Sequence, residues 1–427
     1  MARGCRVLGH PGLRNLLIVA LALLAASCVA DAALAASGGA GVASGSQRGT
    51  TQRSTSRKAP QQPVSPFAQR GMWIWVLAST DGGNLASIVA DAHRYGIQTL
   101  IIKSGDGTGI WSQFNPQVVS VLHANDLRVC AWQYVYGDNP AAEARVGAAA
   151  VRDGADCLVI DAEAEYQGKY IQAQTYISRL RALIGANFPV ALAGFPYIDY
   201  HPSFPYSVFL GPGGAQYNMP QMYWKDIGTT TDAVFAHTYD YNRIYLRPIA
   251  PLGQVYNSPP GHQITRFRQL SRVYGASGVS WWDWQEATPA AWQAVSRPMG
   301  SLAAYAPYTG LATISKGWSG DLVVWAQEHL ITAGFKVGVD GGFGAVTQTA
   351  VEQFQLAHGL LVDGVIGPET WQALLRYPPA QISWSVKSKR ATVASLGGLT
   401  PLPKSASQHA KRYEIPPDLG AGRPGHP

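Results

Sequence analysis

Charged residues are scarce in this chain. Asp, Glu, Lys and Arg make up 14% of its 427 residues, whereas soluble proteins average about a quarter. The net charge is +7, but many of the basic residues lie in the two ends of the chain. The charge therefore gives little support to nucleic acid binding, and we expect no nucleic acid partner.

Cysteine is scarce as well, and it shows no metal-binding pattern. Of four cysteines, Cys5 and Cys28 lie near the N-terminus, which leaves Cys130 and Cys157 for a folded region. A pair of buried free thiols is the favoured interpretation, and a disulfide stays open if the protein is exported. Two cysteines and scattered histidines give no zinc-type spacing. We therefore expect neither a metal nor a cofactor.

No hydrophobic run is long enough to be a convincing membrane span. The longest, residues 16–26, follows Arg3, Arg6 and Arg14 and precedes the small-residue stretch "SCVADAALAAS". This pattern predicts an export signal over residues 1–36, cleaved after Ala35 or Ala36. Two alternatives attach the protein to a membrane: an uncleaved signal, or a lipid on Cys28, because "AASC" resembles a weak lipobox.

Composition divides the rest of the chain. Residues 37–66 and 378–427 have no apolar period and are rich in Gly, Ser, Gln and basic residues, so we expect a disordered linker and a disordered basic tail. Two folded regions remain, residues 67–300 and 320–377, joined by a linker over 301–319.

The first folded region alternates strand and helix signals. Apolar, β-rich runs recur at 71–77, 99–107, 128–137, 157–165, 190–197, 218–224, 249–256 and 278–285. Stretches with apolar residues three and four apart lie between them. Eight such units in roughly 230 residues predict an α/β fold, a (β/α)8 TIM-like barrel. An open doubly wound sheet is the alternative, disfavoured because no Gly-rich phosphate turn follows the first strand.

The second folded region contains an internal repeat. "DGGFGAVT" at Asp340 and "DGVIGPET" at Asp363 share the pattern Asp-Gly-x-x-Gly-x-x-Thr. Each is a turn that leads into a helix, with Pro368 at a first helical position. We expect Asp340 and Asp363 in turns, and Phe343 and Trp371 in the core of a small all-α domain.

The segment "VDGGFGAVTQTAVEQFQLAHGLLVDGVIGPETWQALL" closely resembles the three-helix peptidoglycan-binding domain found on wall hydrolases. The resemblance implies binding to bacterial wall glycan or its peptide stems, and thus a secreted protein at the cell wall or envelope.

Acidic residues follow the fourth strand signal, "CLVIDAEAE". Because strand side chains alternate, Cys157, Val159, Asp161 and Glu163 should share the inner face of the barrel. Both acids then stand at the carboxyl end of the strand, where barrel enzymes carry their chemistry. Glycoside cleavage commonly uses paired carboxylic acids, and crowding of like charges raises a pKa. We expect Glu163 as general acid and Asp161 as its partner; a buried acid pair tied to Lys or Arg is the alternative.

Two families of barrel hydrolases resemble this pattern. Lysozymes of glycoside hydrolase family twenty-five carry Asp-x-Glu here, as in Asp161-Ala162-Glu163. Chitinase-like enzymes of family eighteen carry a longer series of acids at the end of strand four. They also carry a Tyr after strand six and a Trp at strand eight. In this chain "PQMYW" offers Tyr223 and "GVSWWDWQ" offers Trp281 or Trp282. The resemblance implies a muramidase or N-acetylglucosaminidase, in which Tyr223 bonds the 2-acetamido group of the sugar.

Both matches are incomplete. "WIW" stands where the lysozymes carry an Asp on strand one. Val159 stands where the chitinase-like enzymes carry one of their acids. Asp283 is an alternative partner for Asp161, but it faces the barrel axis only if Val279 and Trp281 do. A non-catalytic wall-binding protein with a degenerate barrel therefore remains the second hypothesis.

Aromatic and polar residues near the strand ends are candidates for sugar binding, because aromatic rings can pack on the apolar face of a sugar. These candidates are Trp75, Lys103, Trp132, Glu165, Trp224, Trp282 and Trp284. For Lys103, a snorkelling or paired lysine is slightly favoured, and Asp106 is interpreted as a turn residue. The aromatic loop 195–214 is a candidate cleft wall, with His201 on the surface or in packing.

Overall fold

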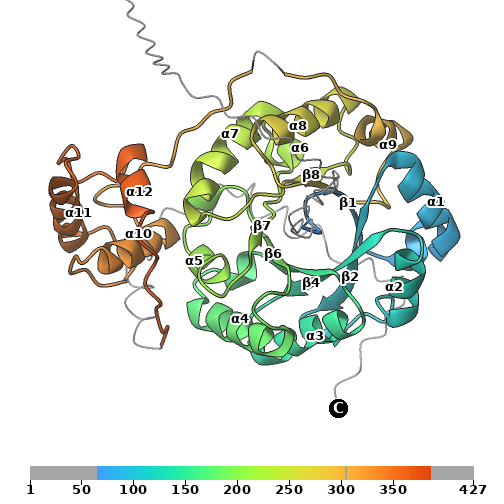
Figure 1. The fold of residues 1–427 in the computed structure, drawn as a ribbon, viewed down its shortest axis with the longest axis horizontal. Coiled ribbons are helices and arrows are strands. Elements are labelled where there is room, and N and C mark those ends of the chain that lie inside the picture. The colour runs from blue at the N-terminus through green and yellow to red at the C-terminus, as the bar shows by residue number, and fades with distance from the viewer. Residues whose placement is uncertain (1–64, 303–304, 386–427) are drawn as a thin grey trace, which may run out of the picture. The chain divides into compact units, whose positions relative to one another are not determined.

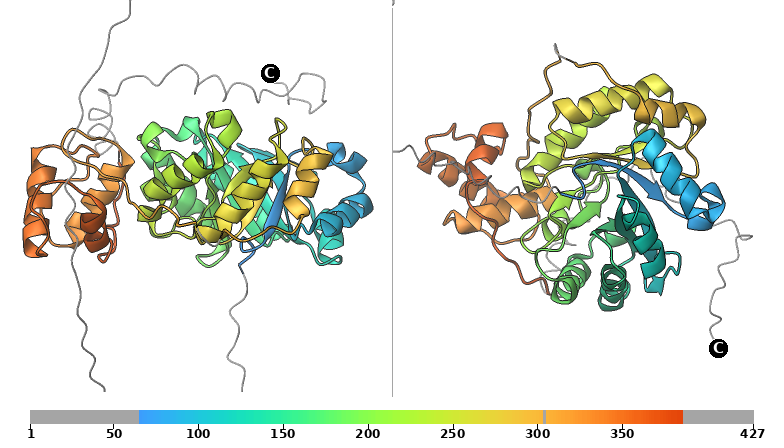
Figure 2. Two further views of the ribbon diagram at one scale, coloured as in Figure 1. Left: turned by 90° about the horizontal axis from the view of Figure 1, so that it is seen from above. Right: turned by 45° about the vertical axis from the view of Figure 1, so that its right-hand side comes forward.

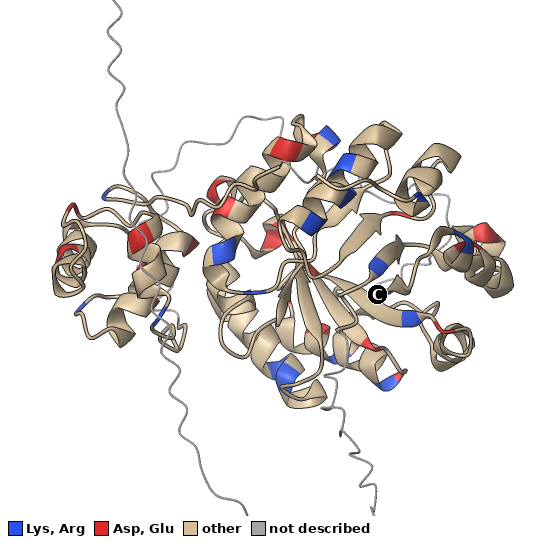
Figure 3. Ribbon diagram, turned by 45° about the horizontal axis from the view of Figure 1, so that its top comes forward, with Lys and Arg blue, Asp and Glu red and all other residues tan. Residues whose placement is uncertain are grey.

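The computed structural model describes residues 65–302 and 305–385. The expected export signal, Cys28, nearly all of the linker before the barrel and most of the basic tail lie outside these residues. Within the described part, no helix combines the length and apolarity needed to cross a membrane. Figure 3 shows how sparsely charged residues are spread along the ribbon.

Eight parallel strands form a closed barrel (Figure 1). They are β1 (Arg70–Ile74), β2 (Thr99–Asp106), β4 (Arg128–Val135), β5 (Cys157–Ala162), β6 (Val190–Ala193), β7 (Tyr217–Asn218), β8 (Leu252–Gln254) and β9 (Val279–Trp282). The first strand pairs with both β2 and β9. Parallel bridges Asn218↔Ile249 and Gln221↔Leu252 close the seam between β7 and β8. The predicted (β/α)8 fold is confirmed, and the open sheet is excluded.

One further strand, β3 (Gly109–Ile110), pairs antiparallel with the end of β2. The helices surround the strands, as Figure 2 shows from two further sides. They are α1 (Leu85–Tyr95), α2 (Pro116–His123), α3 (Pro140–Arg152), α4 (Tyr170–Ile184), α5 (Tyr206–Phe209), α6 (Trp224–Ile227), α7 (Thr231–Asn242), α8 (Gly261–Val273) and α9 (Pro289–Ser296). Short 3-10 turns occupy Leu77–Ser79, Asp81–Gly83, Ala164–Tyr166, Ile198–Tyr200 and Arg243–Tyr245.

Local sequence sets several helix boundaries. The side chains of Asn84, Asn115 and Asn139 accept hydrogen bonds from the first backbone N–H groups of α1, α2 and α3. Such N-caps satisfy donors that the helix itself leaves unpaired. Pro116 and Pro140 then occupy the first helical positions, where the missing N–H costs nothing. These three helices therefore each begin at the residue that follows the capping Asn.

The alternation expected for β5 is observed. Cys157 and Val159 belong to the inner core of the barrel, whereas Leu158, Ile160 and Ala162 belong to the outer core under the helices. Indole rings fill much of the interior: Trp132 and Trp282 have ring centroids 5.3 Å apart. The inner face of β5 thus leads directly toward the carboxyl end of the barrel.

Cys130 and Cys157 form a disulfide, so the favoured prediction of free thiols was wrong. The two residues are directly paired across β4 and β5, and their Cα atoms lie 4.6 Å apart. That separation lies within the range of disulfides. The bond depends on a strand register that cysteine spacing does not reveal.

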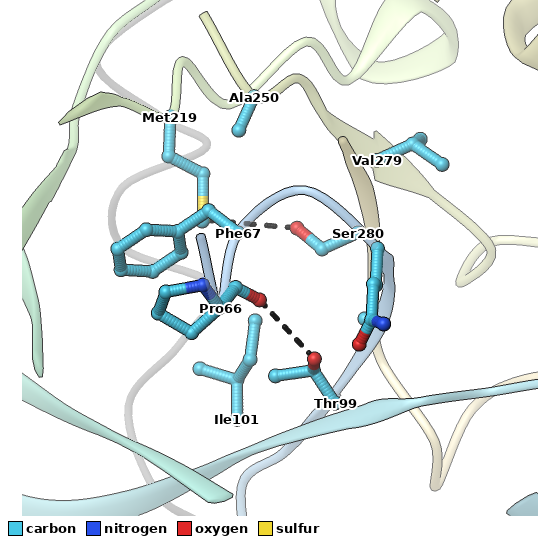
Figure 4. Close-up of a pocket in the computed structure, with 10 residues that line it drawn as sticks. Pro66, Phe67, Thr99, Ile101, Met219, Ala250, Val279 and Ser280 are labelled. Carbon is cyan, nitrogen blue, oxygen red and sulfur yellow. Dashed lines mark hydrogen bonds between the residues drawn. The ribbon is translucent and has the colours of Figure 1, made fainter. Parts of the chain in front are cut away.

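The amino-terminal end of the barrel is closed by the segment before β1 (Figure 4). Phe67 is 4% exposed, and its ring lies 4.8 Å from that of Tyr217. The Thr99 hydroxyl donates a hydrogen bond to the carbonyl oxygen of Pro66 at 3.2 Å. The cavity left at this end measures about 10 Å³, which is room for about one water molecule. No sugar can enter it.

The C-terminal region forms three helices, α10 (Asp321–Thr332), α11 (Ala345–Ala357) and α12 (Pro368–Leu374). The internal repeat has a shared structure. The side chain of Gln327 donates to Asp340 at 2.9 Å and Thr347 at 3.0 Å. In the second repeat the side chain of Gln355 donates in the same way, to Asp363 at 2.9 Å and Thr370 at 3.2 Å.

Both repeats therefore use their Asp as a turn residue. Phe343 and Trp371 are buried in the core, as the sequence predicts.

Candidate active site

Two carboxylates converge at the carboxyl end of β5. Asp161 is the buried fifth residue of this strand, at 5% exposure, and Glu163 follows it, half-buried. The side-chain amide nitrogen of Gln221 donates to Asp161 Oδ1 at 2.9 Å and to Glu163 Oε1 at 3.0 Å. One nitrogen contacts both acids, so the two oxygens cannot be farther apart than the sum of these distances.

The surroundings of this pair favour the protonated form. Burial raises the pKa of Asp161 well above its usual range; the charge of Glu163 adds to this, and Lys103 opposes it. Burial also raises the pKa of Glu163; the hydrogen bond from Gln221 opposes this, and the charge of Glu165 adds to it. Two close carboxyls resist double ionisation. The pair therefore keeps a proton at a higher pH than an isolated carboxyl does.

Lys103 is buried on the inner side of β2. Its ammonium group donates to Asp106 at 2.7 Å, and Asp106 also accepts from the Tyr136 hydroxyl at 2.8 Å. Three indole rings surround the ammonium group, with centroids 4.3 Å, 4.7 Å and 5.8 Å away: Trp111, Trp132 and Trp75. Lys103 is thus a paired lysine, and Asp106 is the last residue of β2 rather than only a turn residue.

Tyr134 and Glu165 lie beside the acid pair. The Tyr134 hydroxyl donates to Glu165 at 2.8 Å. Burial, with the charges of the nearby acids, raises the pKa of Tyr134 far above its usual range, so the phenol keeps its proton. Sequence reasoning missed Tyr134, although it shares inward parity with Cys130 and Trp132. It missed Gln221 as well, although this residue stands in the segment "PQMYW", two positions before Tyr223.

Tyr223 packs against the inner core from the segment after β7. Its ring lies 5.4 Å from that of Tyr256, edge to face. Tyr256 in turn donates its hydroxyl hydrogen bond to Asp226, which also accepts from Asn257 at 3.0 Å. The two loops that follow β7 and β8 thereby hold the Tyr223 ring in place.

The candidate sugar-binding tryptophans fall into two groups. Trp75, Trp132 and Trp282 belong to or pack against the inner core. Trp224 and Trp284 belong to the outer core, so the structure contradicts their expected place in the site. Trp224 donates its indole N–H to Gln263 at 2.8 Å, and Trp284 packs edge to face on Trp292 at 4.8 Å. Both follow the end of a strand, where alternation no longer fixes direction.

Asp283 does not join the acid pair. It is 1% exposed, and it accepts a hydrogen bond from the backbone N–H of Glu286 at 3.3 Å. Burial, with the charge of Glu286, raises the pKa of Asp283 to about 7. Trp281, which shares its parity, lies in the outer core, and no hydrogen bond of the described residues links Asp283 to Asp161. The alternative partnership therefore finds no contact to support it.

The remaining candidates are structural. His201 stacks face to face on Phe195 at 3.5 Å, and burial lowers the pKa of His201 to about 4, so packing explains it. In residues 65–302 and 305–385, no cluster of three or more His, Cys, Asp or Glu side chains is placed to hold a metal ion.

Comparisons with known proteins identify the C-terminal region. Residues 319–374 match the family described as a peptidoglycan binding domain. The zinc D-Ala-D-Ala carboxypeptidase of Streptomyces albus G is 37% identical over 93 residues, 21% of this chain and 35% of the relative. The N-acetylmuramoyl-L-alanine amidase CwlL of Bacillus licheniformis is 40% identical over 83 residues, 19% of this chain and 23% of the relative. The chain thus spans about a third or less of these curated relatives.

Among solved structures, the spore cortex-lytic enzyme SleL of Bacillus cereus is 9% identical, with a TM-score of 0.41 over 55% of this chain and 75% of that one. The strand pairing and the family match at residues 319–374 together show that the chain joins a (β/α)8 barrel to a C-terminal peptidoglycan-binding domain.

Proposed function

We propose that this protein is an exported, wall-associated glycoside hydrolase that cleaves peptidoglycan or a related amino-sugar polymer. The observation that carries the proposal is the single amide nitrogen of Gln221 that contacts both Asp161 and Glu163. It fixes two carboxyls with raised pKa at the end of the barrel where such folds carry their chemistry. The peptidoglycan-binding domain supplies the link to the polymer, because tethering raises the local substrate concentration.

The chemistry follows from the properties of the pair. Protonated Glu163 donates its proton to the glycosidic oxygen, while the carbonyl oxygen of the substrate's 2-acetamido group attacks the anomeric carbon and the glycosidic bond breaks. Asp161 orients the amide N–H, and the Tyr223 hydroxyl donates to its carbonyl oxygen. Water then opens the cyclic intermediate and returns a proton to Glu163. One bond is cleaved and one water is consumed.

The other residues of the mouth fit substrate binding. Half-buried Trp75 offers aromatic surface for the apolar face of a sugar ring. The rings of buried Trp282 and Trp132 pack next to it in the inner core. Polar contacts to a substrate come from Glu165, which accepts a hydrogen bond from Tyr134, and from the Lys103–Asp106 pair. The charges of these residues also act on the pKa of Asp161. In this proposal, loop 195–214 forms one wall of the substrate cleft. Residues 67–300 are the catalytic domain, and residues 320–377 are the wall-binding domain.

The experiment that tests this function follows the turbidity of purified bacterial wall suspensions. Intact protein should clear the suspension, and Glu163→Gln should not. Asp153→Asn, a half-buried acid at the end of α3, is the matched control and should behave like the unaltered protein. Equal clearing by Glu163→Gln would refute the role given to Glu163.

A second function is favoured by one specific observation. The first strand contributes buried Trp73 to the interior and has no acid. Val159 occupies an inner position where the chitinase-like family carries an acid. A barrel that has lost catalysis would still bind the wall through its C-terminal domain. In that case neither the intact protein nor Glu163→Gln would clear the suspension, although both would sediment with the walls.

A further inference from the structure

A groove of about 640 Å³ lies on the C-terminal domain. One side is the loop after α10, with Phe335 and Lys336, and the other is one face of α11, with Val346, Thr349 and Gln353. These α11 residues are three and four apart, so they line up along the helix. The Val346 side chain is 66% exposed. The groove is therefore open to solvent.

The lining suits a peptide better than a sugar. Ala345, Val346 and Ala350 present small apolar groups, Thr349 and Gln353 present a hydroxyl and an amide, and Lys336 is the one charged residue of the lining. No Trp or Tyr lines the groove. The Phe335 ring is already engaged edge to face with Phe354, at 5.6 Å. The flat aromatic platform on which sugar rings commonly stack is therefore missing here.

We propose that this groove binds the peptide stem of the wall polymer, an alanine-rich peptide that ends in a free carboxylate. Lys336 pairs with the carboxylate, Val346 and Ala350 contact alanyl methyl groups, and Gln353 bonds a peptide amide. The proposal rests on the wall-binding half of the proposed function, and it narrows the ligand of this domain to the peptide. The barrel then handles the glycan while the small domain holds the peptide.

The second repeat provides an internal comparison. Both repeats share the Gln–Asp–Thr hydrogen bonds described above, and Gly334 and Gly359 both have positive φ, 95° and 66°. Twenty-three residues after Val346 stands Glu369, and the loop after Gly359 carries Leu361 instead of a lysine. The second repeat thus keeps the scaffold but would repel a carboxylate. Because the scaffold is the same, the difference in lining points to ligand binding at the first repeat alone.

The test uses the full-length protein and calorimetric titration with three probes. They are diacetyl-lysyl-D-alanyl-D-alanine, the same peptide with a C-terminal amide, and chitotetraose, which has sugars but no peptide. The acid peptide should bind about 1.5- to 5-fold more tightly than the amide, which is the scale of an exposed ion pair. Added salt should narrow this difference, and chitotetraose should not compete with the peptide.

Two variants locate the binding site. Lys336→Gln should lower the affinity for the acid peptide to that for the amide. Lys316→Gln, outside the groove, should leave the affinity for the acid peptide unchanged. Val346→Glu copies the acid of the second repeat and should weaken binding of the acid peptide on the order of 10-fold, because two like charges placed side by side repel each other. Circular dichroism checks that each variant keeps its helices.

Three results would overturn the proposal: no peptide binding by the intact protein, unchanged binding by both variants, or competition by chitotetraose. The titrations involve no bond cleavage. A barrel that fails to clear walls therefore leaves this result untouched, and a protein that clears walls without binding the peptide refutes only the groove.

Discussion

The two ends of the barrel are built from the same eight strands but differ in chemistry. At the amino-terminal end, Pro66 and Phe67 fill the opening and leave about 10 Å³. At the carboxyl end, Asp161, Glu163 and Gln221 form a hydrogen-bonded cluster. Barrel folds generally place stability at the first end and function at the second. The comparison teaches that packing of Pro66 and Phe67 fills one end of this barrel, whereas the other end carries the hydrogen-bonded acid pair.

The largest effect on stability should come from the closed end. Phe67→Ala removes a buried ring that contacts Tyr217, and the free energy of unfolding should fall by about 3 kcal/mol. Chemical denaturation measures this change. Wall clearing per folded molecule should stay the same. A large loss of activity in the folded variant would contradict the assignment of stability to one end and activity to the other.

At the mouth, Gln221→Leu should act on activity more than on stability. Removing the amide frees both carboxyls from a fixed position, and kcat/KM should fall by about 10- to 100-fold, the scale of a small misplacement of reacting groups. The variant also loses the hydrogen bond that lowers the pKa of Glu163. The pKa of Glu163 should therefore rise, and the alkaline limb of the pH–rate profile should move upward. An unshifted limb would show that Gln221 does not contact the acid in solution.

Glu163→Gln should stabilise the fold at neutral pH. Because burial raises the pKa of Glu163 on folding, ionisation costs the folded state more than the unfolded state. Below the unfolded pKa both states hold the proton, so the variant gains nothing there. The gain should appear as pH rises and level off above the folded pKa, at about 1 kcal/mol, the scale typical of relieving an active site. Denaturation at pH 4 and pH 8 tests this, and a variant less stable at both values would contradict it.

The smallest effect should come from Thr99→Val at the closed end. It removes the hydrogen bond to Pro66 while keeping the shape of the side chain, and should cost about 0.5 kcal/mol. A thermal melt compared with that of Phe67→Ala would show whether packing or hydrogen bonding holds this end closed. A loss equal to that of Phe67→Ala would assign the closure to the hydrogen bond.

Periodicity made the fold and part of the site predictable. Alternation along β5 places Asp161 with Cys157 and Val159, and the repeat at Asp340 and Asp363 marks two turns. Contacts between distant segments were not predictable. Gln221 reaches Asp161 and Glu163 because β7 and β5 lie on either side of β6 in the sheet. The disulfide depends on the register of β4 against β5.

The sequence also could not predict which way a side chain points once its strand has ended. Trp224 begins α6 and Trp284 lies beyond β9, so neither follows the alternation of its strand. Both turn to the outer core. Trp132 and Trp282, which lie within strands, belong to the inner core, and Trp75, one residue past β1, packs against it.

The most direct test of the account is the release of new reducing ends from purified wall glycan, measured against pH. The intact protein should release them at acidic to neutral pH and lose activity as the pH rises above the raised pKa of the acid pair, because Glu163 must carry a proton. Glu163→Gln should release 100- to 10,000-fold fewer, on the order of a general acid's contribution. Equal release by the two proteins, or none by the intact protein at any pH, would contradict the assignment of the mouth as a glycosidase site.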